Sequence, residues 1–122
     1  MHDNSLISVV DDDESVRESL EGLLMSLGYG VEVFPSAETF LSSDARRRTN
    51  CLILDVRMPG MSGPDLHLEL MRRGERIPTI FITSHREPEI VSRIMANGAV
   101  DCLLKPFAED SLINAINLSF SG

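Results

Sequence analysis

Tryptophan is absent from the 122-residue sequence, tyrosine occurs once, and there are only two cysteines. Cys51 and Cys102 both lie within apolar runs, and neither has the close cysteine or histidine neighbours of a zinc site. A disulfide scaffold needs a denser set of cysteines in a small extracellular chain. We therefore expect two reduced cysteines in or near the core, with a disulfide between them as the alternative.

Basic residues are also scarce, because 11 Lys and Arg stand against 19 Asp and Glu, for a formal net charge of -8. Lys105 is the only lysine. Arg46, Arg47 and Arg48 form the only basic run, which we expect in a solvated loop. Direct binding of nucleic acid needs a basic face that neutralises phosphates. The charge balance argues against such binding and favours protein partners or a cation site.

Long apolar runs are missing as well. No stretch approaches the roughly 18 residues that span a bilayer, and residues 1–4 show no basic region leading into an apolar one. The sequence therefore predicts a cytoplasmic protein without membrane contact. Its hydrophobic fraction of 43% and charged fraction of 25% are typical of globular proteins, and the length fits one domain over residues 1–122.

Five short apolar runs alternate with stretches of helical spacing. Runs this short and continuously apolar are typical of strands buried on both faces of a parallel sheet. They cover Leu6–Val10, Val31–Phe34, Cys51–Leu54, Thr79–Ile82 and Ala99–Leu104. Five repeats of strand and helix predict an α/β fold with a parallel sheet, helices on both faces and right-handed crossovers.

The intervening helices are marked by apolar stripes and by residues that start or stop a helix. An apolar stripe runs from Val16 to Leu27, and Gly28 follows as a helix stop. Ser36 is suited to cap the second helix. The other expected markers are Pro64 to about Arg73 for the third helix, Pro88 to Asn97-Gly98 for the fourth, and Leu112, Ile113, Ile116 and Phe120 for the fifth.

Polar residues follow four of the five runs, at the carboxyl ends where a doubly wound sheet places its site. They are Asp11-Asp12-Asp13-Glu14, Asp55, Thr83-Ser84 and Lys105-Pro106. Two carboxylates about 4 Å apart repel by about 4 kcal/mol at an effective dielectric near 20. A hard divalent cation beside Lys105 relieves that repulsion, and oxygen ligands suit Mg2+.

A plainer interpretation is that the acidic run only begins a helix, where the helix dipole favours acids. It accounts for Asp13 and Glu14, but not for Asp55 or Lys105.

Other site chemistries lack their residues. The sequence contains no G-x-G-x-x-G after the first run, no G-x-x-x-x-G-K-[ST] and no G-x-S-x-G. We expect His85 to be a loop residue near the strand ends, with a catalytic base as the alternative. His2 and His67 are expected on the surface.

Four stretches together resemble the receiver domain of two-component response regulators. They are Val9–Asp13, Leu54–Gly63, Ile82–Ser84 and Leu104–Phe107, and the resemblance covers essentially the whole chain. Ser36–Leu41 and Gly98–Asp101 are most similar to the FixJ-type subgroup. The resemblance implies a flavodoxin-like (βα)5 fold with strand order 2-1-3-4-5. Members of the subgroup usually carry a LuxR-type helix-turn-helix output domain. We expect that domain to be absent from residues 1–122, so that DNA is reached only through it.

The resemblance also implies a phosphorylation site and a metal site. Asp55 would be the carboxylate nucleophile that accepts a phosphoryl group from a phosphohistidine of a sensor histidine kinase. Mg2+, or Mn2+, would be bound directly by Asp12, by Asp55 and by the backbone carbonyl of Arg57, and through water by Asp11.

Further roles follow for the residues around the phosphoryl group. Lys105 would pair with Asp55 and later with a phosphoryl oxygen, across a cis bond to Pro106. Thr83 would turn inward to hydrogen-bond the phosphate, with Ser84 beside it.

Three positions are variable or depart from the family pattern. Arg57 and His85 occupy the two variable positions that flank the phosphoryl group and tune its lifetime. Cys102 stands where the family has an aromatic switch residue, and this departure bears on the switch rather than on phosphorylation.

The implied function is a phosphorylation-activated signalling switch for transcription rather than a turnover enzyme. We expect a phosphorylation-dependent homodimer through the fourth helix and the fifth strand. One alternative, a phosphatase of the haloacid dehalogenase type, needs an aspartate where Arg57 stands. The other is a phosphorylation-independent interaction module. The complete set of Asp11, Asp12, Asp55, Thr83 and Lys105 argues against it.

Overall fold

A computed structural model describes residues 5–121, so the expectation for His2 lies outside the described residues. The strands are β1 Leu6–Val10, β2 Gly30–Phe34, β3 Cys51–Asp55, β4 Thr79–Thr83 and β5 Asp101–Leu104. The helices are α1 Glu14–Ser26, α2 Ala37–Ser42, α3 Gly63–Arg72, α4 Pro88–Ala96 and α5 Glu109–Ser121, and a 3-10 helix, η1, spans Asp44–Arg47. The strands pair in parallel in the order β2-β1-β3-β4-β5, which confirms the predicted fold class and strand order.

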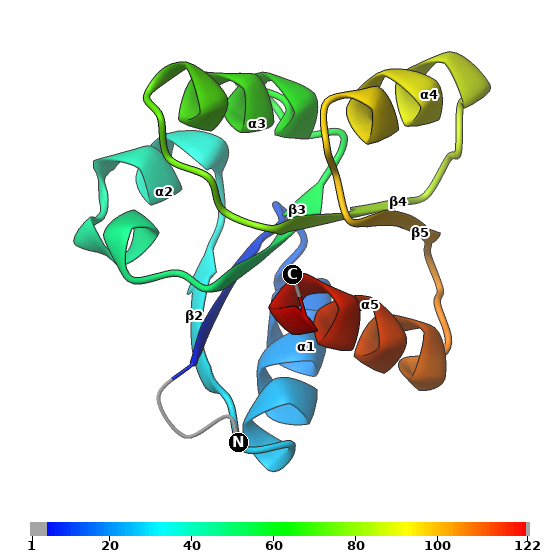
Figure 1. Ribbon diagram of the computed structural model, residues 1–122. Helices are drawn as coiled ribbons and strands as arrows, with labels where there is room; N and C mark the ends of the chain where they lie inside the picture. Colours follow the sequence, from blue (N-terminus) through cyan, green and yellow to red (C-terminus); the bar gives the residue numbers. More distant parts are fainter. Residues whose placement is uncertain (1–4, 122) are drawn as a thin grey trace.

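Helices cover both faces of this sheet (Figure 1). Helices α1 and α5 pack on one face, where Leu20, Leu24 and Leu112 join the inward side chains of the central strands. Helices α2, α3 and α4 cover the other face through Phe40, Leu66 and Ile94 among others. Because adjacent strand residues point to opposite faces, each buried strand contributes to both cores.

The predicted helix signals act as expected. Ser36 caps α2 in a capping box with Thr39, and Pro88 occupies the first turn of α4. Gly28 ends α1 with a φ of +94°, a conformation that favours glycine.

The prediction that strands are buried on both faces is confirmed only for the three central strands of the sheet. Strands β1, β3 and β4 are almost entirely buried, but β2 and β5 are edge strands whose side chains are partly exposed. Leu104, at the end of β5, is 45% exposed. The fifth run is also shorter as a strand than expected, because Ala99 and Val100 precede β5.

Two further expectations need correction. Arg46 and Arg47 lie in η1 rather than in a loop, and Arg46 forms an ion pair with Glu75 at 2.7 Å. His67 is buried on α3 instead of exposed, with its ring edge-on to Phe81 at a centroid distance of 5.4 Å. An apolar neighbour of this kind accommodates a neutral imidazole, and burial lowers the His67 pKa.

The two cysteines are free and buried. Cys51 belongs to the core beneath α1 and α5, and Cys102 belongs to the core on the opposite face of the sheet. The reduced state is therefore confirmed, and the alternative of a disulfide between them is wrong. Among residues 5–121, no helix has the length and apolar character needed to cross a membrane.

Candidate functional site

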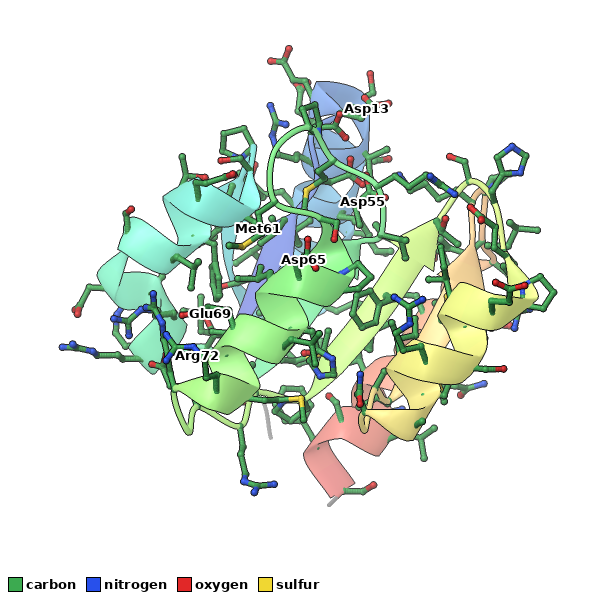
Figure 2. The ribbon with its side chains drawn as sticks, turned by 90° about the horizontal axis from the view of Figure 1, so that it is seen from above. Asp13, Asp55, Met61, Asp65, Glu69 and Arg72 are labelled. Carbon is green, nitrogen blue, oxygen red and sulfur yellow. The ribbon has the colours of Figure 1, made fainter. Side chains whose placement is uncertain are left out.

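Carboxylates from two adjacent strands meet at the carboxyl ends of the sheet. Asp11 and Asp12 directly follow β1, and Asp55 is the last residue of the neighbouring β3. One oxygen atom from each of the three residues lies within 4.8 Å of the others. Figure 2 shows Asp55 near Asp13, on the side of the molecule where α1 begins. We call Asp11, Asp12 and Asp55 the acidic cluster.

Asp11 is the most enclosed member of the cluster, with no exposed surface. Its Oδ1 accepts a hydrogen bond from the backbone N–H of Asp13 at 2.9 Å, and its Oδ2 accepts one from Lys105 Nζ at 2.9 Å. Both oxygens are therefore already engaged within the chain. Asp12 is exposed and Asp55 offers its carboxylate to the same space, so these two are better placed as direct ligands of a cation.

Lys105 supplies the positive charge of the site from the first position after β5. Its Nζ lies 3.6 Å from Asp55 Oδ1, farther than from Asp11. The resemblance implies a pair with Asp55, but the hydrogen bond goes to Asp11 and Asp55 is the second partner. Burial alone would lower the Lys105 pKa, but the two carboxylates outweigh burial and the pKa is raised. The bond from Lys105 to Pro106 is cis.

Asp55 is 5% exposed and shares the Lys105 charge with Asp11. Burial and the nearby Asp11 charge raise the Asp55 pKa from 3.8 to about 7, although Lys105 and the backbone N–H of Arg57 act in the opposite direction. A hydrogen bond that the protonated Asp55 carboxyl donates to the Asp12 side chain also favours the protonated acid. The site thus holds more negative charge than one lysine balances.

The other two acids of the run do begin a helix. Asp13 caps α1 by accepting a hydrogen bond from the backbone N–H of Ser15 at 2.8 Å, and Glu14 occupies the first turn. The plainer interpretation is therefore correct for Asp13 and Glu14. It does not extend to Asp11, Asp55 or Lys105, which bond across the ends of three strands.

The segment after Asp55, residues 56–62, forms the β3–α3 loop. Its Arg57 N–H donates a hydrogen bond to the Asp55 carboxylate. At the far end, Gly63 donates its N–H to the carbonyl of Val56 at 3.0 Å. A Cβ on Gly63 would overlap the backbone carbonyl oxygen of Asp55, so the start of α3 approaches β3 as closely as only glycine allows.

Thr83 ends β4 and is 2% exposed. Its hydroxyl donates to the carbonyl of His85 at 2.9 Å and accepts from the His85 N–H at 3.1 Å. The side chain is therefore committed to the loop between β4 and α4. Ser84 and His85 are exposed beside it.

Two contacts near the site were missed by sequence reasoning. Arg57 forms an ion pair with Glu87, the residue that precedes α4. The Glu38 carboxylate of α2 accepts a hydrogen bond from the backbone N–H of Met61 at 2.9 Å. Each contact joins residues more than 20 positions apart, and no local sequence pattern predicts such a contact.

Cys102 lies on β5 and is 3% exposed. It packs in the same core as Phe81 and Ile94, and burial raises the pKa of its thiol. It is therefore a small buried side chain at the position where the resemblance implies an aromatic ring.

The residues of the acidic cluster fit a hard divalent cation. The available donors are carboxylate and carbonyl oxygens, which Mg2+ prefers over nitrogen or sulfur. A cation also offsets the excess negative charge that raises the Asp55 pKa. The exposed position of Asp12 leaves room for the waters that Mg2+ retains.

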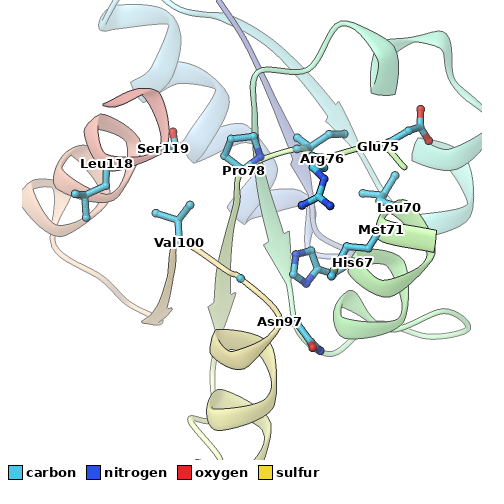
Figure 3. A pocket seen from close by; sticks show the side chains of 12 residues that line it. His67, Leu70, Met71, Glu75, Arg76, Pro78, Asn97, Val100, Leu118 and Ser119 are labelled. Atoms are coloured by element: carbon cyan, nitrogen blue, oxygen red, sulfur yellow. The ribbon is translucent and has the colours of Figure 1, made fainter. Parts of the chain in front are cut away.

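A separate cavity of about 340 Å³ contains none of the proposed site residues. It is lined by His67 of α3, Asn97 after α4 and Leu118 of α5, near the start of β4 and β5 (Figure 3). Because parallel strands all start at one edge, this cavity lies at the end of the sheet opposite the acidic cluster.

Residues 7–117 match the response regulator receiver domain. The response regulator protein TodT of Pseudomonas putida is 46% identical over 112 residues, which are 92% of this chain and 49% of TodT. The chain thus spans about half the length of the curated relatives that it matches.

Solved structures show the same likeness. The response regulator StyR superposes with a TM-score of 0.90 at 44% identity, covering 97% of this chain and 60% of that one. The structure named FixJ-N superposes with a TM-score of 0.89 at 38% identity, covering 99% and 96%.

The raised Asp55 pKa predicts that, without divalent ions, the free energy of unfolding depends on pH. A folded-state pKa of about 7 against 3.8 when unfolded means that folding favours the protonated acid between these values. Stability is therefore lost as pH rises from about 4 to about 7. Asp55→Asn removes the charge and should be more stable than the unaltered protein by about 2–4 kcal/mol at pH 8, with the gain shrinking toward pH 4.

Urea unfolding in EDTA across this pH range measures the difference. Glu18→Gln, an exposed acid of α1, is the charge-matched control and should show no such trend. A gain for Asp55→Asn that is the same at pH 4 and pH 8 would contradict the pKa assigned to Asp55.

Proposed function

The chain belongs to the receiver-domain family of response regulators, and from that premise we propose that it is a phosphorylation-activated switch of a two-component system. The observation that carries the proposal is the placement of Asp55. Its carboxylate lies between two further aspartates and Lys105, at an edge of the sheet where a partner has access to Asp12.

Asp55 acts as the nucleophile toward a phosphohistidine of a sensor histidine kinase. A carboxylate oxygen attacks phosphorus, the new P–O bond forms as the P–N bond breaks, and the electron pair returns to the imidazole nitrogen. The carboxylate must be ionised for this step. Lys105, 3.6 Å from Asp55, favours the ionised form and then pairs with a phosphoryl oxygen.

Asp12, Asp55 and the backbone carbonyl of Arg57 hold Mg2+ or Mn2+ in this proposal, with Asp11 acting through water. When bound, the ion neutralises charge on the transferring phosphoryl group. Asp11 is suited to the indirect role because its two oxygens already accept hydrogen bonds from Asp13 and Lys105.

Thr83 and Ser84 carry the response to phosphorylation. For its hydroxyl to reach a phosphoryl oxygen, Thr83 must release both hydrogen bonds with His85, and this release moves the loop toward Asp55. Because Cys102 is small and stands in place of an aromatic ring, little side-chain rearrangement on β5 accompanies the movement of Thr83. The loop before α4 therefore carries most of the signal.

Arg57 and His85 flank the phosphoryl group and tune its lifetime by controlling the approach of water. Arg57 is held by Glu87 in the unmodified protein, so the same pair also links the β3–α3 loop to the start of α4.

The proposed partners follow from the family. In the cytoplasm, a sensor histidine kinase donates the phosphoryl group, and an output domain outside residues 1–122 passes the signal to DNA. Support for a role in transcription comes from the name of one relative, the transcriptional regulatory protein FixJ. A phosphorylation-dependent homodimer forms through α4 and β5, whose exposed apolar residues include Met95 and Leu104.

The first test of this proposal uses acetyl phosphate, a small phosphoryl donor. With Mg2+ the protein should gain the mass of one phosphoryl group, because the proposal assigns Asp55 alone as the acceptor, and Asp55→Asn should gain none. Intact mass measurement at neutral pH gives the answer. Equal modification of both proteins would contradict the assignment, and no modification of either would favour a phosphorylation-independent interaction module.

The second test concerns the homodimer. Light scattering with the phosphoryl mimic beryllofluoride and Mg2+ should show a mass increase that Met95→Glu abolishes, because a charge replaces an apolar side chain at the α4–β5 surface. Met25→Glu is the matched control, since Met25 is 60% exposed near the end of α1 and away from that surface. A beryllofluoride complex that stays monomeric at high micromolar concentration, or an increase that Met95→Glu leaves intact, would contradict this interface.

A further inference from the structure

Glu38 is an exposed residue in the first turn of α2 that reaches the β3–α3 loop. Its Oε2 accepts a hydrogen bond from the backbone N–H of Met61 at 2.9 Å. That hydrogen bond lowers the Glu38 pKa, so the carboxylate is ionised at neutral pH. A hydrogen bond to an ionised acceptor is stronger than one between neutral groups. Helix α2 therefore anchors a loop that belongs to a different part of the chain.

The fit between this carboxylate and the loop is close. Gly60 has a φ of +76°, and a Cβ at this position would lie 2.6 Å from Glu38 Oε2. The loop backbone thus turns directly against the carboxylate, in a conformation that favours glycine. Met61 is partly buried against the core, so its backbone and its side chain are both fixed. In Figure 2 Met61 lies between α2 and Asp55.

The same loop touches the acidic cluster at its beginning. Arg57 donates its backbone N–H to the Asp55 carboxylate, and Gly63 closes the loop by bonding to Val56 at 3.0 Å. Between these contacts, the hydrogen bond to Glu38 is the only one that residues 58–61 form with a described residue outside the loop. Loss of this anchor frees the stretch that follows the Arg57 carbonyl.

We propose that Glu38 is a positioning residue that sets the affinity of the acidic cluster for Mg2+ by holding the β3–α3 loop, and with it the Arg57 carbonyl, in place. The proposal rests on the metal site of the proposed function. An oxygen that is already held near its binding position loses less freedom when the ion binds. Glu38 itself contacts neither the ion nor the phosphoryl group.

A second effect of Glu38 must be separated from this one. An acid in the first turn of α2 also interacts favourably with the helix dipole, which supports the helix without affecting the loop. Glu38→Gln removes the charge but retains an oxygen that accepts from Met61. Glu38→Ala removes both. The difference between these two variants therefore reports the hydrogen bond.

The experiment is an NMR titration of the backbone amides with Mg2+, without any phosphoryl donor. Glu38→Ala should raise the half-saturating Mg2+ concentration about three- to tenfold, and Glu38→Gln should stay within about twofold of the unaltered protein. Glu89→Ala, which alters an exposed glutamate in the first turn of α4, is the matched control and should have no effect. With acetyl phosphate, Glu38→Ala should need more Mg2+ for half-maximal phosphorylation but reach the same rate at saturation.

Two results would overturn the inference: unchanged Mg2+ affinity in Glu38→Ala, or equal losses in Glu38→Ala and Glu38→Gln, which would assign the effect to charge. These differ from a failure of the proposed function, in which the unaltered protein itself neither binds Mg2+ nor accepts a phosphoryl group.

Discussion

The rest of the site depends on one constraint: two carboxylates share a single lysine, and a third carboxylate lies beside them. Asp11 and Asp55 lie 2.9 and 3.6 Å from the same Lys105 nitrogen, and Asp12 completes the cluster with no cationic partner among residues 5–121. One positive charge does not balance three negative ones, and burial of Asp55 removes the water that would otherwise screen it. The folded chain thus holds an excess of negative charge that a divalent cation offsets.

The fold maintains this arrangement by close backbone packing. Parallel strands bring Asp11, Asp55 and Lys105 to one edge, and Gly63 lets α3 begin directly against the Asp55 carbonyl. The β3–α3 loop is joined to α2 by the hydrogen bond to Glu38, and to the start of α4 by the ion pair of Arg57 and Glu87. A change of charge at Asp55 is therefore next to the contacts that position α4, and this adjacency is what a switch requires.

The sequence predicted the parts of the structure that follow from local pattern and parallel topology. Apolar runs located all five strands, and polar residues at their ends identified Asp11, Asp55 and Lys105, because such ends meet at one edge. Contacts that depend on how separate helices and loops pack were not predictable. Neither the Glu38–Met61 bond nor the burial of His67 against Phe81 has a local signal. Strands β2 and β5 are partly exposed because they lie at the edges of the sheet. The apolar runs do not show which strands are at the edges, and only the strand order does.

The pH dependence of Mg2+ affinity tests the excess charge at Asp55 most directly. With an Asp55 pKa of about 7, a proton competes with the ion for the same carboxylate below that pH. The dissociation constant for Mg2+, measured by titrating amide NMR shifts, should be constant above about pH 8 and about tenfold larger at pH 6. A dissociation constant that stays the same from pH 8 down to pH 5.5 would show that Asp55 is ionised throughout, and would contradict the account.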